Sequence, residues 1–207
     1  MRPNNESQNI FLESFNVEVN FKVKKILDPV DLVYPLPVVL VTCSDKQGNN
    51  NIITIAWTTN LSRKPVCLGI TIGKTKYSVK LINETMEFAV NIPSNNLLEK
   101  IEQCGFTHGN NTDKFALSKF TQKDADLIAV KLIDECPINI ECKVINILDI
   151  GTSFFFVGEV LKVHLDEDIL LDDNEVDYKK LDPVLFTQKR YYSLGRLLGQ
   201  RGFLQKS

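Results

Sequence analysis

The sequence lacks the features that would place it in a membrane, in a secretory pathway or on nucleic acid. It has no run of about 18 apolar residues, so no membrane-spanning helix is predicted. The first residues, MRPNNESQNIFLESF, lack the apolar core of a secretory signal. The 24 basic and 26 acidic residues nearly balance, and a net charge of −2 gives no field that would attract nucleic acid. We therefore expect a globular protein with neither a membrane nor a nucleic-acid partner.

Paired cysteines of the CxxC type are absent as well. The chain has five cysteines, an odd number, at Cys43, Cys67, Cys104, Cys136 and Cys142. Two of them lie in apolar runs, where a thiol behaves as a small hydrophobic side chain. Reduced thiols and a cytoplasmic location are the simplest interpretation.

Histidine is scarce, with only His108 and His164. Neither has a spacing that pairs it with a cysteine, so a Cys–His nucleophile is not expected. A zinc site built from Cys136, Cys142 and His164 would lack the usual paired spacing. His164 fits a surface residue. No metal site and no catalytic side chain are predicted.

What is present is a series of strand patterns in one domain, expected over residues 17–207 behind a flexible tail of residues 1–16. Val17, Val19, Phe21 and Val23 alternate in the first expected strand. Further strands are expected over residues 38–43, 52–57, 66–72, 87–93, 137–150 and 153–166. Helices are expected over 75–84 and over 94–105, the second with Ser94 as N-cap and Gly105 as its stop. Residues 106–130 look like a polar surface excursion. Many strands in series with short helices predict a mainly β fold, an antiparallel barrel.

The strand expected over residues 66–72 has one unusually small face, formed by Cys67, Gly69 and Thr71. Small side chains on one side of a strand let a flat or bulky group approach the backbone. At the end of this strand, Gly73, Lys74 and Thr75 match the last part of the phosphate-binding P-loop motif. The glycine that such a loop needs five positions earlier is replaced by Leu68, so a P-loop is not predicted.

A simpler anion site remains at the same place. The strand end delivers Lys74, Thr75, Lys76 and Ser78 to the start of a helix, whose free N–H groups and positive dipole end favour a phosphate. A solvated, capped helix start explains the same residues without any ligand. The sequence leaves both interpretations open.

The stretch NIITIAWTTNLSRKP, residues 51–65, changes abruptly from apolar side chains to short hydroxyl and amide side chains. These donors, beside the single tryptophan Trp57, suit the polar edge and flat face of a flavin ring. A turn with Trp57 in the core is the alternative. Which way Trp57 faces stays open.

Several segments together resemble the flavin reductase-like, FMN-binding split-barrel proteins, and in particular the flavoredoxin branch. They are PLPVVLVTCSDKQGNNNIITIAWTTNLSRKPVCLGITIG, CGFTHGNNTDKF, DECPINIECKV, FFFVGEVLKVHLDEDIL and YYSLGRLLGQRGF. The resemblance implies a six-stranded split barrel that forms a homodimer, with FMN near the subunit interface. It also implies electron or hydride transfer at the flavin N5 atom, for which no protein acid or base is obligatory.

The resemblance carries a set of flavin-binding positions onto this chain. Thr54, Ile55, Ala56, Trp57, Thr58, Thr59 and Asn60 would line the ring, and Ser62, Lys76, Tyr77 and Ser78 would hold the ribityl chain and phosphate. Tyr192 and Arg196 would reach the flavin from the C-terminal segment of either subunit.

One departure affects the expected electron donor. Short-chain NAD(P)H:flavin oxidoreductases of this superfamily tend to carry Gly-Asp-His where this chain has Gly151, Thr152 and Ser153. The expected function is an NAD(P)H-dependent flavin oxidoreductase that passes electrons to flavin or another acceptor. A flavoredoxin-type electron-transfer protein, reduced by a partner protein, is the alternative.

Overall fold

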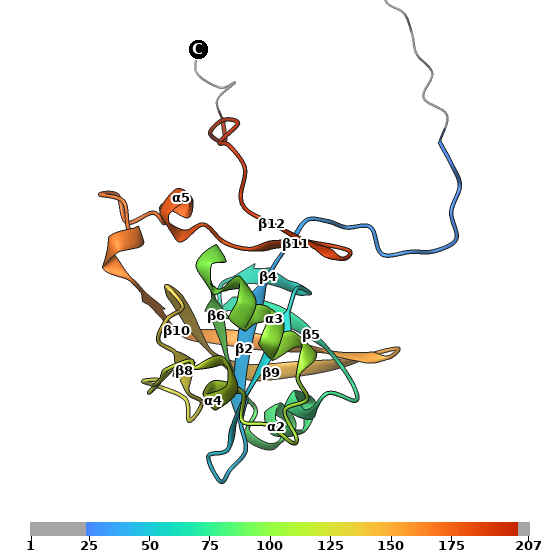
Figure 1. The fold of residues 1–207 in the computed structure, drawn as a ribbon, viewed down its shortest axis with the longest axis vertical. Coiled ribbons are helices and arrows are strands. Elements are labelled where there is room, and N and C mark those ends of the chain that lie inside the picture. Colours follow the sequence, from blue (N-terminus) through green and yellow to red (C-terminus); the bar gives the residue numbers. More distant parts are fainter. Residues whose placement is uncertain (1–23, 203–207) are drawn as a thin grey trace, which may run out of the picture. The chain divides into compact units, whose positions relative to one another are not determined.

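The computed structural model describes residues 24–202. The chain divides into two units, Met1–Leu32 and Val33–Ser207 (Figure 1). In the first unit, the described residues 24–32 form no helix or strand. The expected tail over 1–16 and the expected strand over 17–23 lie outside the described residues, so the boundary between tail and domain stays a prediction.

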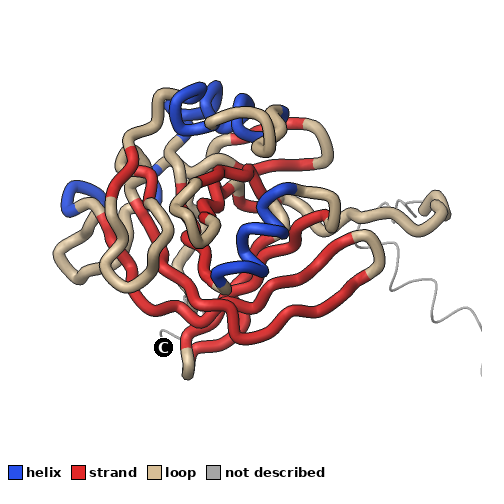
Figure 2. Tube along the Cα trace, turned by 90° about the horizontal axis from the view of Figure 1, so that it is seen from below, coloured by secondary structure: helices blue, strands red, loops and turns tan. Residues whose placement is uncertain are grey.

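The second unit is built on a seven-stranded antiparallel sheet with the order β3-β2-β6-β9-β10-β5-β4 (Figure 1). Its strands are β2 (Val39–Ser44), β3 (Asn50–Ile55), β4 (Thr58–Arg63), β5 (Val66–Gly73), β6 (Glu87–Ile92), β9 (Ile138–Ile150) and β10 (Ser153–Leu165). The strands of this sheet bend around a common core, as Figure 2 shows from below. The expected long hairpin is confirmed as β9–β10, which turns at Gly151 with a positive φ of 55°.

The sheet turns back on itself because its two edge strands are halves of one bent strand. β3 and β4 occupy opposite edges, yet only Ala56 and Trp57 separate them in the chain. The Trp57 carbonyl accepts a hydrogen bond of 2.9 Å from the Thr71 N–H, which draws the bend onto β5. Counted as one strand, β3 and β4 give the six strands that the resemblance implies. The mainly β, antiparallel split barrel is therefore confirmed.

The polar run after Trp57 is a strand, and the expectation of a turn or loop there is wrong. Residues of β4 pair antiparallel with β5, from Thr58 opposite Ile70 to Arg63 opposite Val66. An edge strand that faces solvent tolerates short polar side chains, which explains why this strand lacks an apolar pattern.

Smaller elements surround this sheet. Two further sheets contain β1 (Leu36–Pro37) with β11 (Leu185–Thr187) and β12 (Arg190–Tyr192), and β7 (Gln122–Lys123) with β8 (Leu132–Ile133). The helices are α2 (Tyr77–Thr85), α3 (Leu98–Phe106), α4 (Lys114–Ser118) and α5 (Tyr178–Leu181), with 3-10 turns η1 (Asn95–Leu97) and η2 (Glu167–Ile169). Among residues 24–202, no helix combines the length and apolar character needed to span a bilayer.

The helix expected over residues 94–105 differs at both ends. Ser94 precedes the 3-10 turn η1 but makes no side-chain capping bond, and the α-helix proper begins only at Leu98. Gly105 lies inside the last turn of α3 rather than ending it. An added Cβ at Gly105 would lie 3.5 Å from the Thr54 side chain, an ordinary contact, so packing here does not require a glycine.

The expected surface excursion over residues 106–130 is wrong for residues 114–120, which include a short helix and contribute to a core. Asp113 accepts hydrogen bonds from the Phe115 and Ala116 N–H groups and so starts the short helix α4. Phe115 and Phe120 are buried in a core cluster with residues of β2, β3 and α3. The helix has only five residues, too few to show a helical period, so only the capping aspartate could have predicted this element.

The small face of β5 receives a side chain of the same protein. A Cβ added at Gly69 would lie 2.1 Å from the ring of Phe155, which comes from the neighbouring strand β10. The close approach predicted from this face is real, but Phe155 makes it at Gly69. Thr71, farther along the same face, lines the central cavity described below.

Candidate functional site

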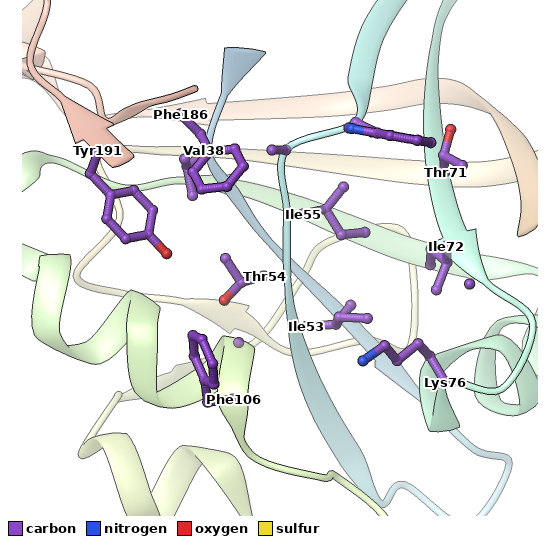
Figure 3. Close-up of a pocket in the computed structure, with 14 residues that line it drawn as sticks. Val38, Ile53, Thr54, Ile55, Thr71, Ile72, Lys76, Phe106, Phe186 and Tyr191 are labelled. Atoms are coloured by element: carbon purple, nitrogen blue, oxygen red, sulfur yellow. The ribbon is translucent and has the colours of Figure 1, made fainter. Parts of the chain in front are cut away.

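Three neighbouring cavities surround β3 and α3. The first, which we call the central cavity, has a volume of about 330 Å³ and is lined by residues 53–57 of the bent strand together with parts of β5, α3 and the β11–β12 hairpin. In Figure 3, Phe106, Phe186 and Tyr191 lie on one side of β3, and Thr71, Ile72 and Lys76 lie on the other. A mostly apolar wall with a few hydroxyl and ammonium groups is typical of sites for flat organic ligands.

Trp57 lines the central cavity and is 49% exposed. It does not fill the core, so that alternative is wrong. The sharp bend after Ile55 explains its position, since β3 ends there and its inward–outward alternation ends with it.

The second cavity, which we call the basic cavity, has a volume of about 470 Å³. It shares Ile53, Lys76, Gly105 and Phe106 with the central cavity. Its lining also includes His108 and Lys114, and none of its described lining residues is acidic. The first N–H groups of α2 have no partner within the helix, and Tyr77 and Ser78 of this turn line the cavity. An anion would be stabilised here.

A buried amide carries an unpaired oxygen in the wall of the basic cavity. The Asn51 amide donates a hydrogen bond of 2.8 Å to the Ser78 hydroxyl, and both residues are at most 3% exposed. Within residues 24–202, no donor lies within hydrogen-bonding distance of Asn51 Oδ1. Gly109 packs so close that an added Cβ would lie 2.0 Å from this oxygen. A buried acceptor of this kind favours a ligand hydroxyl.

Lys114 is a buried lysine that the sequence interpretation missed. It is 4% exposed, lines the basic cavity, and donates a hydrogen bond of 2.7 Å from Nζ to the Cys104 carbonyl. Burial lowers the pKa of Lys114, and nearby Lys76 lowers it further. An anion between these two ammonium groups would relieve their repulsion. The sequence signal for this position was Asp113, whose capping pattern indicates a helix that begins at Lys114.

An aromatic wall closes the other side of the central cavity. Phe186 and Tyr191 are paired across β11 and β12, with ring centroids 5.5 Å apart. The Tyr191 hydroxyl donates a hydrogen bond to the Glu102 carboxylate of α3. Burial of the phenol and this neighbouring carboxylate raise the pKa of Tyr191 to about 12. The C-terminal hairpin is thereby attached to α3.

The structure places the predicted flavin-binding residues in three groups. Thr54, Ile55, Ala56, Trp57 and Lys76 line the central cavity. Lys76, Tyr77 and Ser78 line the basic cavity. The structure does not bring the remaining six to either cavity: Thr58, Thr59, Asn60, Ser62, Tyr192 and Arg196.

Two of these six positions have a structural explanation: a hydrogen bond at Thr58 and strand alternation at Tyr192. The Thr58 hydroxyl donates to the Gly69 carbonyl at 3.0 Å and so serves the pairing of β4 with β5. Tyr192 is 51% exposed, whereas its neighbour Tyr191 lines the cavity, because successive side chains of β12 point to opposite faces.

His164 is partly exposed and belongs to a polar cluster with Asp126 and the buried Glu141. Its Nε2 atom is 2.6 Å from the Glu141 carboxylate, and the His164 side chain is 20% exposed. Asp126, Glu141 and His164 bring ligand-type atoms within 4.8 Å of one another, and this group contains neither Cys136 nor Cys142. Glu141 also accepts hydrogen bonds from the Asp126 and Leu127 N–H groups, so it anchors the residues before β8.

Comparisons with known proteins agree with this geometry. Flavoredoxin of Desulfovibrio vulgaris (Miyazaki F) superposes with a TM-score of 0.82 and 31% identity, over 89% of this chain and 100% of that one. Flavoredoxin from Methanosarcina acetivorans gives the same score and identity over 89% and 98%. An uncharacterized protein of Archaeoglobus fulgidus is 31% identical over 67% of this chain and 77% of its own length. The flavin reductase like domain matches residues 32–195. The chain therefore belongs to the flavin reductase-like split-barrel family and, within it, groups with the flavoredoxins.

Proposed function

We propose that this protein binds FMN and transfers electrons through it. The observation that carries the proposal is the junction of two cavities of different chemistry: an apolar cavity beside a basic one, with Lys76 in the lining of both. A nucleotide with a flat ring at one end and a phosphate at the other matches this arrangement. When bound, FMN supplies the redox chemistry, and the protein supplies binding and orientation.

The isoalloxazine ring would lie in the central cavity. Ile53 and Ile55 supply apolar contacts, and Thr54 and Thr71 supply hydroxyl groups. The exposed indole of Trp57 supplies an aromatic surface. Of the predicted contacts, those of residues 54–57 are kept in this proposal. The predicted contacts of Thr58, Thr59, Asn60 and Ser62 would require another arrangement. Either backbone groups of β4 contact the flavin, or β4 contacts the flavin bound to a second subunit.

The ribityl chain and phosphate would lie in the basic cavity. The unpaired Asn51 oxygen suits a ribityl hydroxyl, and Lys76, Lys114 and the first turn of α2 suit the phosphate. This fit rests on the donors and acceptors of the chain itself. Lys76, Tyr77 and Ser78 keep the roles that the resemblance implies, and Lys114 joins them.

The electron donor is either NAD(P)H or a partner protein, and one observation favours the partner protein. The Thr152 carbonyl accepts a hydrogen bond of 3.0 Å from the Lys74 N–H, so the β9–β10 turn is tied to the loop that follows Gly73 of the central cavity. Related reductases tend to have a histidine in this turn, where this chain has Ser153. Without that histidine, we infer slow turnover with NAD(P)H.

The experiment is an anaerobic titration of the purified protein reconstituted with FMN. A yellow protein that NADH and NADPH do not bleach, but a chemical reductant does, would support the electron carrier. Rapid bleaching by either nucleotide would support the reductase. The double variant Lys76→Ala, Ser78→Ala should bind FMN more weakly than the wild type. A protein that takes up no FMN would refute both functions.

A homodimer is part of the proposal. The β9–β10 hairpin exposes apolar side chains, with Ile145, Ile150 and Val163 each more than half exposed. Exposed apolar side chains along a long hairpin suit an interface with a second copy of the chain. Light scattering should give twice the chain mass; a monomer at micromolar concentration would refute this part. The five free, buried thiols are compatible with the predicted cytoplasmic location, which stays a prediction.

A further inference from the structure

A third cavity, which we call the acidic cavity, adjoins the central cavity. It has a volume of about 640 Å³ and is lined by Leu98, Glu99, Glu102, Gln103, Phe106 and Tyr191. Phe106 and Tyr191 also line the central cavity, so two aromatic side chains separate the two spaces. Phe106 is 80% exposed, which is unusual for a phenylalanine and marks a surface suited to an aromatic contact.

The charge of this cavity is opposite to that of the basic cavity. Its described lining residues include the carboxylates Glu99 and Glu102 but no lysine, arginine or histidine. Lys100, the one basic residue within α3, points elsewhere: its Nζ donates to the Lys119 carbonyl and lies 4.5 Å from the centroid of the Phe120 ring. From the basic cavity through the central cavity to the acidic cavity, the lining therefore changes from basic through apolar to acidic.

We propose that the acidic cavity binds the second reactant of the flavin, and that this reactant is a small aromatic molecule without negative charge. This inference rests on the proposed function, because a second reactant requires a bound flavin. Binding of the molecule itself can be measured with or without FMN. Phe106 and Tyr191 would contact the flat face of the molecule, and Glu99 and Glu102 would stabilise a positive charge on it. Because the same two rings face the central cavity, only Phe106 and Tyr191 would separate a molecule held here from the proposed flavin ring.

The charges also specify what is excluded. NADH and NADPH carry two or more phosphate charges, which the two carboxylates would repel. The acidic cavity is open to solvent, so a molecule bound here stays partly exposed and is held by ring contact and charge. The acidic cavity disfavours nicotinamide nucleotides. The presence of Ser153 where related reductases tend to have a histidine points the same way.

The test is calorimetric titration of the oxidised, FMN-saturated protein with two redox dyes, benzyl viologen as an aromatic dication and anthraquinone-2-sulfonate as an aromatic anion. No electrons move under these conditions, so the readout is binding alone. The dication should bind more tightly than the anion. The double variant Glu99→Gln, Glu102→Gln should lower its affinity about tenfold, as expected for two partly exposed charge pairs.

Three variants separate charge from structure. Tyr191→Phe keeps both carboxylates and should leave most of the viologen affinity. Glu99→Gln alone, at an exposed position, should weaken binding about threefold even if the double variant does not fold. Glu167→Gln, an exposed carboxylate in η2, is the matched control and should change nothing.

Equal binding of both dyes, or unchanged viologen affinity in the Glu99 and Glu102 variants, would overturn the inference. Repeating the titration on flavin-free protein distinguishes this failure from that of the proposed function. If the protein binds viologen through the two carboxylates but takes up no FMN, the acidic binding site is supported and the proposed FMN function is refuted.

Discussion

The Asn51 amide donates a hydrogen bond of 2.8 Å to the Ser78 hydroxyl, and this bond joins β3 to the first turn of α2. These two elements carry the two ends of the proposed FMN site. The bond is buried and also orients the unpaired Asn51 oxygen in the wall of the basic cavity. The geometry of the site therefore depends on a polar contact that contributes to folding as well.

Replacing Ser78 with alanine should destabilise the protein. The Asn51 amide would lose its acceptor while it stays buried, which costs about 1–3 kcal/mol. Urea denaturation should show a lower midpoint with an unchanged slope. Thr59→Ala on the exposed edge strand, where the hydroxyl lies 3.4 Å from the neighbouring Asn60 carbonyl, is the control and should shift the midpoint little. Equal stability of both variants would contradict this role of Ser78.

Gly69→Ala should also destabilise the protein, because its Cβ would lie 2.1 Å from the Phe155 ring. Overpacking of this kind costs about 1–3 kcal/mol. Phe155→Leu in the same chain should recover part of that loss, so the two changes should couple in a double-mutant cycle. Gly73→Ala is the matched control, since its Cβ would meet its nearest atom, in the Lys76 side chain, at 3.9 Å. Strict additivity at positions 69 and 155 would refute the contact.

Glu141 should make stability depend on pH. Burial of the Glu141 carboxyl raises its pKa, but the hydrogen bonds from Asp126, His164 and Leu127 outweigh burial, and the net pKa lies below the ordinary value of 4.5. Such a group stabilises the folded state above pH 4.5, and the contribution is lost as the pH falls through the folded pKa.

The measurement is the free energy of unfolding of the wild type and of Glu141→Gln. Near neutral pH the variant should be less stable by about 3 kcal/mol, since the Asp126 and Leu127 N–H groups and His164 lose a charged acceptor. The difference should shrink as the pH falls below 4.5 and through the lowered pKa of the folded state. A difference that stays constant over this range would show that ionisation of Glu141 contributes nothing.

Much of the barrel could be predicted from the sequence because its strands carry clear apolar patterns. The hairpin of β2 and β3, the long hairpin of β9 and β10, and the helix that starts after Lys76 follow from alternation and spacing alone. The edge strand β4 could not be predicted in this way. Its polar side chains face solvent, and its pairing with β5 is a tertiary effect that leaves no pattern in residues 58–63.

The site was predictable only where it is local in sequence. Residues 54–57 and 76–78 lie at the ends of recognisable elements, whereas Lys114, Phe106 and Tyr191 reach the cavities from segments far along the chain. Tyr191, the neighbour of the predicted Tyr192, lines the central cavity, and a shift of one residue in a strand moves a side chain to the other face.

Trp57 provides a direct optical signal for the central cavity. It is the single tryptophan of the chain and lines that cavity, so bound FMN should quench its fluorescence. Titration with FMN should give a saturable decrease in Trp57 emission, with the same affinity as the change in flavin fluorescence. Trp57→Phe should abolish the protein signal while FMN still binds. Saturable FMN binding with unchanged Trp57 emission would place the ring elsewhere.

The central claim is that FMN spans the central and basic cavities with its phosphate beside Lys76 and Lys114. The most direct measurement compares the dissociation constants of FMN and riboflavin, which differ only in the phosphate, for the wild type and Lys76→Ala. The account predicts that the wild type binds FMN about 100-fold more tightly than riboflavin, the effect of one or two charge-assisted hydrogen bonds. Lys76→Ala should weaken FMN binding about tenfold or more and leave riboflavin binding within about twofold. Equal affinity of the wild type for FMN and riboflavin, or an equal loss for both in the variant, would contradict it.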